Sequence, residues 1–138
     1  MRRSKRGRKS SKSKMDWAKA KDVQTKVEFL VKDLELDWVN TKRIRCVRSK
    51  YSSSRAVARI WGLSQIWQLF VKKGPLYIIE VISERFDKLS GEEQGKVLLH
   101  ELVHIPQTFS GALLPHTRRG KTSFYARLKH FHKLYLER

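Results

Sequence analysis

The sequence predicts a single α+β domain that follows a short basic tail. Three observations support this fold class. Apolar residues recur at three-and-four spacing near both ends of the chain, as they do in an N-terminal and a C-terminal amphipathic helix. Short apolar segments between them are typical of a small sheet of three or four strands. A further helical pattern contains His100 and His104 at a spacing that places both on one face.

The tail, residues 1–14, consists of Met1 followed only by Arg, Lys, Ser and Gly. A segment without apolar residues cannot bury enough surface to fold alone, so we expect it to be disordered. Residues 15–138 are enough for one compact domain. The sequence has no apolar run typical of a signal peptide or a membrane-spanning helix, and Cys46 is its only cysteine. These features predict a cytoplasmic (intracellular) protein with no membrane partner and no intramolecular disulfide.

The first helix is predicted over residues 16–36, with Asp16 as its cap, because apolar residues occupy one helical face. A first strand is predicted over residues 42–48, where Ile44 and Cys46 alternate with basic residues. Cys46 is therefore expected to be a small core residue rather than a reactive thiol.

The next predicted strands lie around a glycine-containing turn. Residues 56–61 and 66–70 flank this turn and predict a hairpin. Trp61 and Trp67 are expected to lie in the core rather than to stack on bases. Residues 76–82 form a nearly continuous apolar run, which predicts a central strand.

The histidine-containing helix has recognisable ends. Ser90 and Glu93 form a capping-box signature at its start, and Pro106 is expected to end it one turn after His104. A closing helix is predicted from the spacing of four aromatic and apolar residues, Phe124, Leu128, Phe131 and Tyr135.

His100-Glu101-Leu102-Val103-His104 has the H-E-x-x-H spacing of a zinc-binding helix. Residues four apart lie one turn apart on nearly the same face, so His100 and His104 converge on one metal ion. Glu101 points elsewhere and is free to act as a general base toward an attacking water. Zinc at such a site lowers the pKa of water to about 7 and polarises a peptide carbonyl. The alternative is a buried helix whose histidines only form hydrogen bonds.

A zinc site of this kind needs a third ligand. His116 is the preferred candidate, because glycine and proline residues let the intervening segment turn back toward the helix. The alternative is that His116 is an exposed loop residue that binds no metal. His130 and His132 are weaker candidates, because both belong to the predicted closing helix. Glu80 interrupts an apolar strand, so it either lies on an exposed face or orients a ligand imidazole.

Several segments resemble a metallopeptidase family found in archaea and phages: RIRCVRS (43–49), SRAVARIWGL (54–63), YIIEVISERFDKLS (77–90) and HELVHIPQTFSGALLPH (100–116). The resemblance extends from about Ala18 to about Thr117. It implies a zincin-like fold, a Zn²⁺ cofactor bound by His100, His104 and His116, and Glu101 as general base. In fold outline and size the chain is also similar to SprT-type minimal zincins, which act on proteins attached to DNA.

The chain has 31 Lys and Arg residues against 13 Asp and Glu residues, a formal charge of +18. Such a charge predicts a nucleic acid partner, DNA or RNA, bound mainly through its phosphates. A thermophile-like solvated surface is the alternative, but such surfaces usually mix both signs. The residues predicted to bind nucleic acid belong to the tail and to two acid-free runs: Arg2, Arg3, Lys5, Arg6, Arg8, Lys9, Lys12, Lys14, Arg43, Arg45, Arg118, Arg119 and Lys121.

Two functional hypotheses follow. The first is a zinc-dependent metallopeptidase that associates with nucleic acid and hydrolyses a protein substrate through a metal-activated water. The second is a non-catalytic basic protein that binds nucleic acid or ribosomes, in which the metal site only stabilises the fold. The number of protein ligands separates them, because a catalytic zinc keeps an open position and a structural zinc is closed by four protein ligands.

Overall fold

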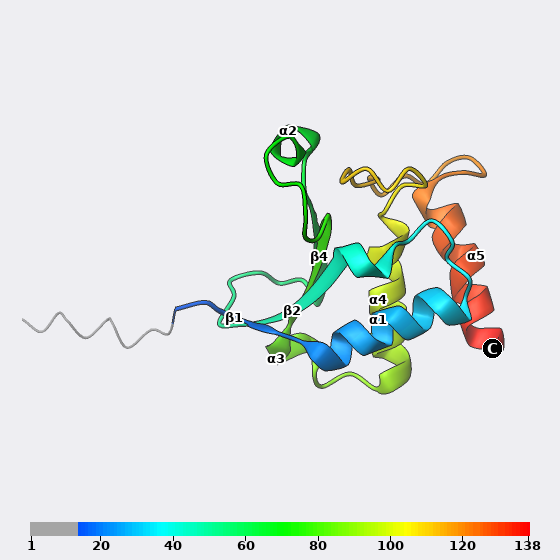
Figure 1. Ribbon diagram of the computed structural model, residues 1–138. Helices are drawn as coiled ribbons and strands as arrows, with labels where there is room; N and C mark the ends of the chain where they lie inside the picture. Colours follow the sequence, from blue (N-terminus) through cyan, green and yellow to red (C-terminus); the bar gives the residue numbers. More distant parts are fainter. Residues whose placement is uncertain (1–13) are drawn as a thin grey trace, which may run out of the picture.

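The computed structural model describes residues 14–138, and within this range the chain forms the predicted α+β domain (Figure 1). The prediction of a disordered tail falls almost entirely on residues outside the described range. Lys14, the one described residue of that tail, is exposed. None of the helices within residues 14–138 is long and apolar enough to cross a bilayer.

The sheet has four strands in the order β1-β2-β4-β3. The strands are β1 (Asp16–Lys19), β2 (Ile44–Lys50), β3 (Ala58–Gly62) and β4 (Tyr77–Ile82). β2 and β4 are parallel, whereas β1 and β3 run antiparallel to their neighbours. β4 therefore has a hydrogen-bonded partner on each side, which confirms the central strand predicted for residues 76–82.

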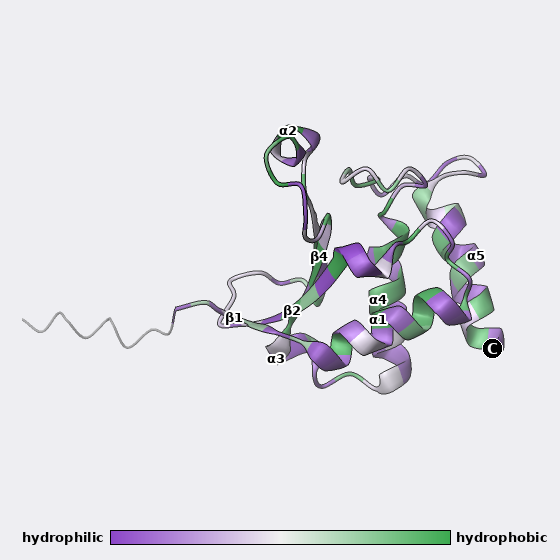
Figure 2. Cartoon of the chain, in the orientation of Figure 1, coloured by the Kyte–Doolittle hydropathy of each residue, from purple (hydrophilic) through white to green (hydrophobic). Residues whose placement is uncertain are grey.

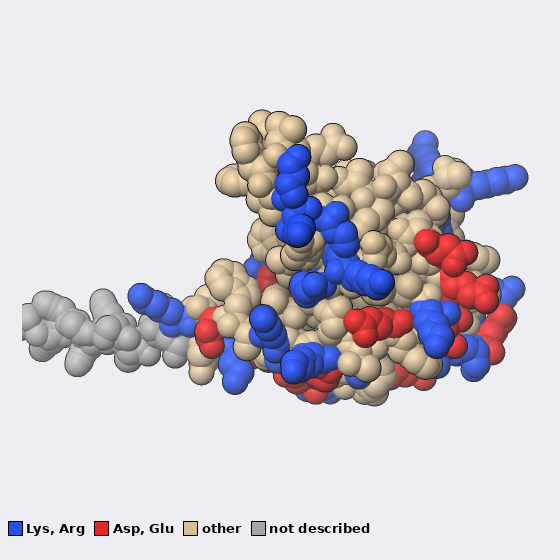
Figure 3. All heavy atoms as spheres, viewed as in Figure 1, with Lys and Arg blue, Asp and Glu red and all other residues tan. Residues whose placement is uncertain are grey.

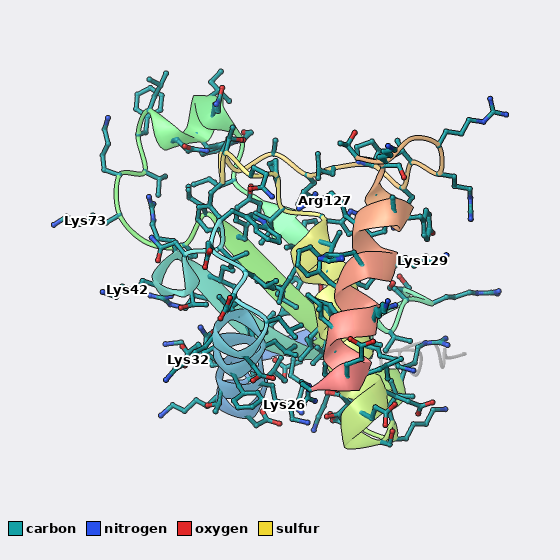
Figure 4. The ribbon with its side chains drawn as sticks, turned by 90° about the vertical axis from the view of Figure 1, so that its right-hand side faces the viewer. Lys26, Lys32, Lys42, Lys73, Arg127 and Lys129 are labelled. Atoms are coloured by element: carbon teal, nitrogen blue, oxygen red, sulfur yellow. The ribbon has the colours of Figure 1, made fainter. Side chains whose placement is uncertain are left out.

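The three longer helices lie on one side of this sheet (Figures 1 and 4). The three longer ones are α1 (Lys21–Asp33), α4 (Gly91–Val103) and α5 (Phe124–Glu137). The short ones are η2 (Thr41–Arg43), α2 (Gln65–Gln68) and α3 (Ser83–Phe86). The predicted N-terminal and C-terminal helices are thus both present.

The core lies between the sheet and the three longer helices. Alternate strand residues face the helices, so Ile44, Cys46, Ile79 and Val81 are buried there. Burial raises the pKa of the Cys46 thiol to about 12, which keeps it protonated. This position confirms the predicted role of Cys46 as a small core residue.

The start of the predicted first helix is wrong. Residues 16–19 form β1, and α1 begins only at Lys21. Pairing with β2 satisfies the backbone groups of this segment, and the Ala20 N–H donates to the Cys46 carbonyl at 3.0 Å. Trp17, which the helical spacing placed in the core, is 59% exposed. A long-range strand pairing therefore outweighs the local helical periodicity here.

The predicted hairpin is also wrong in its second half. Residues 66–70 do not form a strand; they belong to α2 and the turn after it, which project from the body as an arm (residues 62–75). β3 pairs instead with β4. The arm carries exposed apolar residues (Figure 2), and Trp61 and Trp67 are 50% and 63% exposed rather than in the core.

Gly95 lies at the contact between α4 and α5, where there is no space for a side chain. A Cβ added there would lie 2.0 Å from the hydroxyl oxygen of Tyr135, which donates to the Glu92 carbonyl at 3.0 Å. We expect Gly95→Ala to lower the free energy of unfolding by about 1–3 kcal/mol, because the tyrosine must move. Chemical denaturation measures this loss. Gly91→Ala is the matched control on the same helix, since an added Cβ there meets nothing within 4 Å; equal losses in both variants would contradict the packing explanation.

Candidate metal centre

The helix that carries the H-E-x-x-H sequence begins as predicted and ends earlier than predicted. The Ser90 side chain accepts a hydrogen bond from the Glu93 N–H at 3.1 Å, which confirms the N-terminal cap. α4 ends at Val103, with His104 as its C-terminal cap rather than one turn inside the helix. Pro106 disfavours helical geometry at the residue before it, so the helix stops as soon as the second histidine is in place.

The three predicted histidines come together. The Nε2 atoms of His100 and His116 lie 3.1 Å apart. The ring centroids of His104 and His116 are 4.4 Å apart, and those of His100 and His104 are 5.2 Å apart. One ring nitrogen from each residue lies within 4.8 Å of the other two. Two nitrogens bound to one tetrahedral zinc at 2.0–2.1 Å would be about 3.4 Å apart, close to the 3.1 Å that separates the His100 and His116 nitrogens.

A backbone carbonyl determines which nitrogen of His104 is available. The Nδ1 atom of His104 lies 2.6 Å from the Leu114 carbonyl oxygen, and the Leu114 N–H donates to the His104 carbonyl at 2.7 Å. A carbonyl oxygen only accepts, so Nδ1 must carry the hydrogen. The lone pair of the neutral ring is then on Nε2, which is the nitrogen left for a metal.

The segment that returns to the helix is shaped by contacts that the sequence did not reveal. Gly111 has a φ of +95°. A Cβ added to Gly62 would lie only 2.1 Å from the Gly111 carbonyl oxygen, so the loop packs directly against the Gly62 backbone. The Tyr77 hydroxyl accepts from the Gly111 N–H and donates to the Ala112 carbonyl, both at 2.8 Å. These contacts bind the loop to β3 and β4 and set the path that brings His116 back to α4.

Phe124, the first residue of α5, packs against all three imidazoles. Its ring centroid lies 4.3 Å from that of His104, 5.0 Å from that of His100 and 4.9 Å from that of His116. The sequence predicted Phe124 only as a core residue of the closing helix. The side chain is 2% exposed, so it is also an apolar base beneath the histidine cluster.

The electrostatics favour neutral imidazoles. Burial lowers the pKa of His100 to about 4, and the neighbouring His104 and His116 add to this effect. Burial also lowers the pKa of His104 and outweighs its hydrogen bond to Leu114. Both rings are therefore uncharged at neutral pH and have a free lone pair. Burial raises the pKa of Glu101 to about 8, whereas a cation on the imidazoles would act in the opposite direction and favour the carboxylate.

The histidines and Glu101 line one cleft of about 450 Å³. One wall is the returning loop, residues 113–116, and the other is strand β3 at Ala58, Arg59 and Ile60. The carboxylate that the sequence predicts as a base and the nitrogens that it predicts as ligands thus open onto the same space. This arrangement can hold a cation and a proton acceptor next to an extended chain.

The rival site residues lie elsewhere. Glu80 is fully buried, and its carboxylate accepts hydrogen bonds from Arg59 Nε at 2.8 Å and Trp61 Nε1 at 2.9 Å. It therefore neither faces solvent nor orients an imidazole, contrary to both sequence-based alternatives. His130 is exposed on α5, and His132, on the same helix, is half-buried near His100.

The predicted nucleic-acid-binding residues occupy separate parts of the surface. Those from Arg2 to Lys12 lie outside the described range. Arg43 and Arg45 lie where η2 meets β2, and Arg43 Nε donates to the Gly74 carbonyl at 2.9 Å. Figure 3 shows basic side chains around η2 and the base of the arm, and others at the loop before α5. That loop carries three exposed basic residues, Arg118, Arg119 and Lys121.

Comparison with known protein families agrees with this site. A family model described as "Putative phage metallopeptidase" matches residues 15–133, a range that contains the whole sheet, α4 and the loop with His116. Neither a curated protein nor a solved structure matches the chain, so the similarity to SprT-type zincins stays a prediction. Because the family model covers most of the sequence, the chain belongs to the putative phage metallopeptidase family.

Proposed function

We propose that this protein is a zinc-dependent peptidase that works in association with nucleic acid. The observation that carries the peptidase proposal is the convergence of His100, His104 and His116 beside Glu101 in one cleft. Three imidazoles and one free carboxylate are the set of groups used by catalytic zinc sites of metallopeptidases. Membership in a metallopeptidase family supports the same conclusion.

The donor set fits zinc. The residues that would hold the ion are His100, His104 and His116, and burial favours the neutral form of His100 and His104. Imidazole nitrogen is a preferred zinc ligand, and three of them leave the fourth tetrahedral position open. When bound there, zinc supplies a Lewis acid that polarises a peptide carbonyl and lowers the pKa of water.

Glu101 is the proposed general base. It takes a proton from the water that attacks the scissile carbonyl, and then passes this proton to the amine that leaves. The side chain is 8% exposed, so bulk water does not compete for the carboxylate. Burial raises the pKa of Glu101 and a cation on the imidazoles would lower it, and these opposing effects suit a group that must both accept and release a proton.

The substrate is proposed to be an extended polypeptide bound along β3. This strand is an edge of the sheet and pairs only with β4, so its outer N–H and C=O groups are available for another chain. Residues 58–60 of β3 also line the metal cleft. A substrate that pairs with this edge would pass directly in front of Glu101 and the histidines.

Association with nucleic acid is supported by charge. The chain has a formal charge of +18, and several of its cations are exposed within the described residues, among them Arg45, Arg119 and Lys121. Such a surface binds phosphates with a strong dependence on salt and little dependence on base sequence. Proteins bound to nucleic acid are therefore the proposed substrate class.

The competing function is a binding protein whose metal is purely structural. A structural zinc has four protein ligands, whereas the histidine group contains three residues within the described part of the chain. The ligand count therefore favours catalysis over a structural role.

Metal analysis combined with proteolysis tests the proposal. Purified full-length protein is expected to contain about one zinc ion per chain and to hydrolyse DNA-bound proteins. A chelator should abolish hydrolysis, and added zinc should restore it. Stoichiometric zinc without hydrolysis of any DNA-bound or free protein would instead support the structural alternative.

A further inference from the structure

The sheet has a second face, turned away from the helices. Strand alternation places the core residues on one face and ten other side chains on the opposite face, of which Ser49, Glu80 and Ile82 are buried. The helices α1, α4 and α5 lie only on the core side (Figures 1 and 4). We call the accessible part of this opposite surface the open sheet face, and it consists of Trp17, Lys19, Arg45, Val47, Arg59, Trp61 and Ile78.

Two tryptophans are exposed on the open sheet face. Trp17 is 59% exposed and Trp61 is 50% exposed, whereas Val47 and Ile78 between them are half-buried. Large aromatic side chains at this degree of exposure are unusual in strands whose other residues are well packed. They provide flat apolar surfaces that are open to a partner.

Trp61 is held in a fixed orientation. Its Nε1–H donates to the Glu80 carboxylate at 2.9 Å, and the guanidinium carbon of Arg59 lies 5.0 Å from the ring centroid. Arg59 also donates to Glu80, through Nε, at 2.8 Å. The polar end of the indole is therefore satisfied within the protein, and the remaining exposed surface is the aromatic ring. A ring positioned in advance loses little conformational entropy when another planar group stacks on it.

The open sheet face is positively charged. Lys19 and Arg45 are exposed, and the only acidic side chain that points to this side of the described strands, Glu80, is paired with Arg59. Burial raises the pKa of Glu80, but its hydrogen bonds, above all the one from Arg59, outweigh this and keep the carboxylate ionised. Phosphates would therefore meet cations here without a facing free carboxylate.

More cations adjoin the open sheet face where β1 ends. Lys19 and Arg45 line a depression of about 540 Å³ together with Lys21 and Lys42, and one acid, Glu28, also lines it. Figure 4 shows Lys42 pointing outward, away from the helices. Four cations against one carboxylate make this depression suitable for a phosphate backbone.

The spacing of the tryptophans suits an extended strand of nucleic acid. Trp17 is in register with Ser49 on β2, and Trp61 is in register with Ile78 on β4. The two positions are three strand spacings and four residues apart, which corresponds to about 20 Å. Several nucleotides of an unpaired strand fill this distance, with bases at the rings and phosphates near Lys19 and Arg45. Bases inside a duplex are already stacked on each other and offer no free ring face to these tryptophans.

We propose that the open sheet face binds single-stranded nucleic acid, with Trp17 and Trp61 stacking on bases and Lys19 and Arg45 contacting phosphates. The inference rests on the proposed association with nucleic acid, and it specifies where the nucleic acid binds and that it is single-stranded. Arg59 links the two functions, because it contacts Trp61 on this face and also lines the metal cleft. A protein attached to the bound strand would lie next to the cleft.

Binding of labelled oligonucleotides to the full-length protein tests this site. Fluorescence anisotropy is measured with a 20-nucleotide thymidine strand and with a 20-base-pair duplex at low salt. Trp17→Ala is expected to weaken single-strand binding by about 5- to 150-fold, the range for loss of one stacked base, and to leave duplex binding within about 2-fold. Trp17 is exposed, and its indole N–H donates no hydrogen bond to the described residues, so thermal unfolding should match wild type.

Matched controls come from exposed residues outside the open sheet face. Trp67→Ala removes an equally exposed indole from the arm, and is expected to leave both affinities unchanged. Arg45→Ala should make the dependence of log affinity on log salt shallower by about 0.7 for the single strand. Lys32→Ala, on the α1 side where Figure 4 shows Lys32, should not.

The outcomes separate this inference from the proposed function. If wild type binds the single strand and Trp17→Ala binds it equally well, the proposed role of the open sheet face is overturned, while the proposed association with nucleic acid stands. Equal losses for strand and duplex, or a comparable loss in Trp67→Ala, would also overturn it. If wild type binds neither oligonucleotide at low salt, the association itself is overturned, and protein hydrolysis remains the separate test of the peptidase.

Discussion

Replacing Glu101 by Gln is expected to abolish hydrolysis while leaving metal binding unchanged. Glutamine keeps the size and the hydrogen-bonding capacity of the side chain but cannot take a proton from water. Loss of a general base costs about 100- to 10,000-fold in rate. Glu101 is not one of the three converging ligands, so the zinc content should equal that of wild type. Burial already raises the pKa of Glu101 to about 8, so removing its charge should not destabilise the fold.

Glu92→Gln is the matched control for this change. Glu92 is on the same helix, is exposed and forms only a weak 3.8 Å ion pair with Lys96. Initial rates of protein hydrolysis and zinc content are measured for both variants. Undiminished hydrolysis by Glu101→Gln would rule out the proposed mechanism, and loss of zinc from that variant would make Glu101 a ligand instead.

Replacing His116 by Ala is expected to weaken zinc binding by more than about 100-fold. Changes to groups that merely support a ligand typically cost 10- to 100-fold, so loss of a ligand itself should cost more. His116 is exposed, so the fold should tolerate the change. Competition with a chelator of known zinc affinity measures the difference. Hydrolysis should fall in parallel, because a partly loaded site is a partly active site.

His130→Ala is the control, since His130 is an exposed histidine on α5 outside the cluster. It should bind zinc as wild type does. Unchanged affinity in His116→Ala would show that the third ligand is misassigned. His132 would then be the next residue to replace, because it is half-buried close to His100.

The sequence predicted those features of the fold that depend on neighbouring residues. The Ser90 cap, the position of α4 and the apolar strand β4 all follow from local patterns of hydrogen-bonding and apolar side chains. The errors concern segments whose structure depends on distant partners. β1 forms because β2 offers it a free edge, and the arm forms because β3 pairs with β4, which follows it in sequence. The local sequences of β1 and of the arm do not reveal these distant strand pairings.

The same distinction applies to the site. The spacing of His100, Glu101 and His104 follows from helical geometry, and the return of His116 was predicted from its flexible connection. The contacts that hold the site in place involve a backbone carbonyl at Leu114 and a ring at Phe124. Every residue has a backbone carbonyl, so the sequence does not indicate which one accepts a hydrogen bond from His104. The sequence likewise does not indicate whether a buried phenylalanine packs on leucines or on imidazoles.

The contact between Phe124 and the three imidazoles has a consequence for how the site acquires its ion. Packing on Phe124 and the hydrogen bond from His104 to the Leu114 carbonyl already orient the rings. Metal binding therefore does not have to order the imidazoles at a cost in affinity. In zinc fingers, by contrast, folding and metal capture are one event, and chelators unfold the domain. We therefore expect the two events to be separable here. Loading of the proposed zinc ion would follow folding and would be reversible without unfolding, so the concentration of free zinc would set the fraction of loaded molecules.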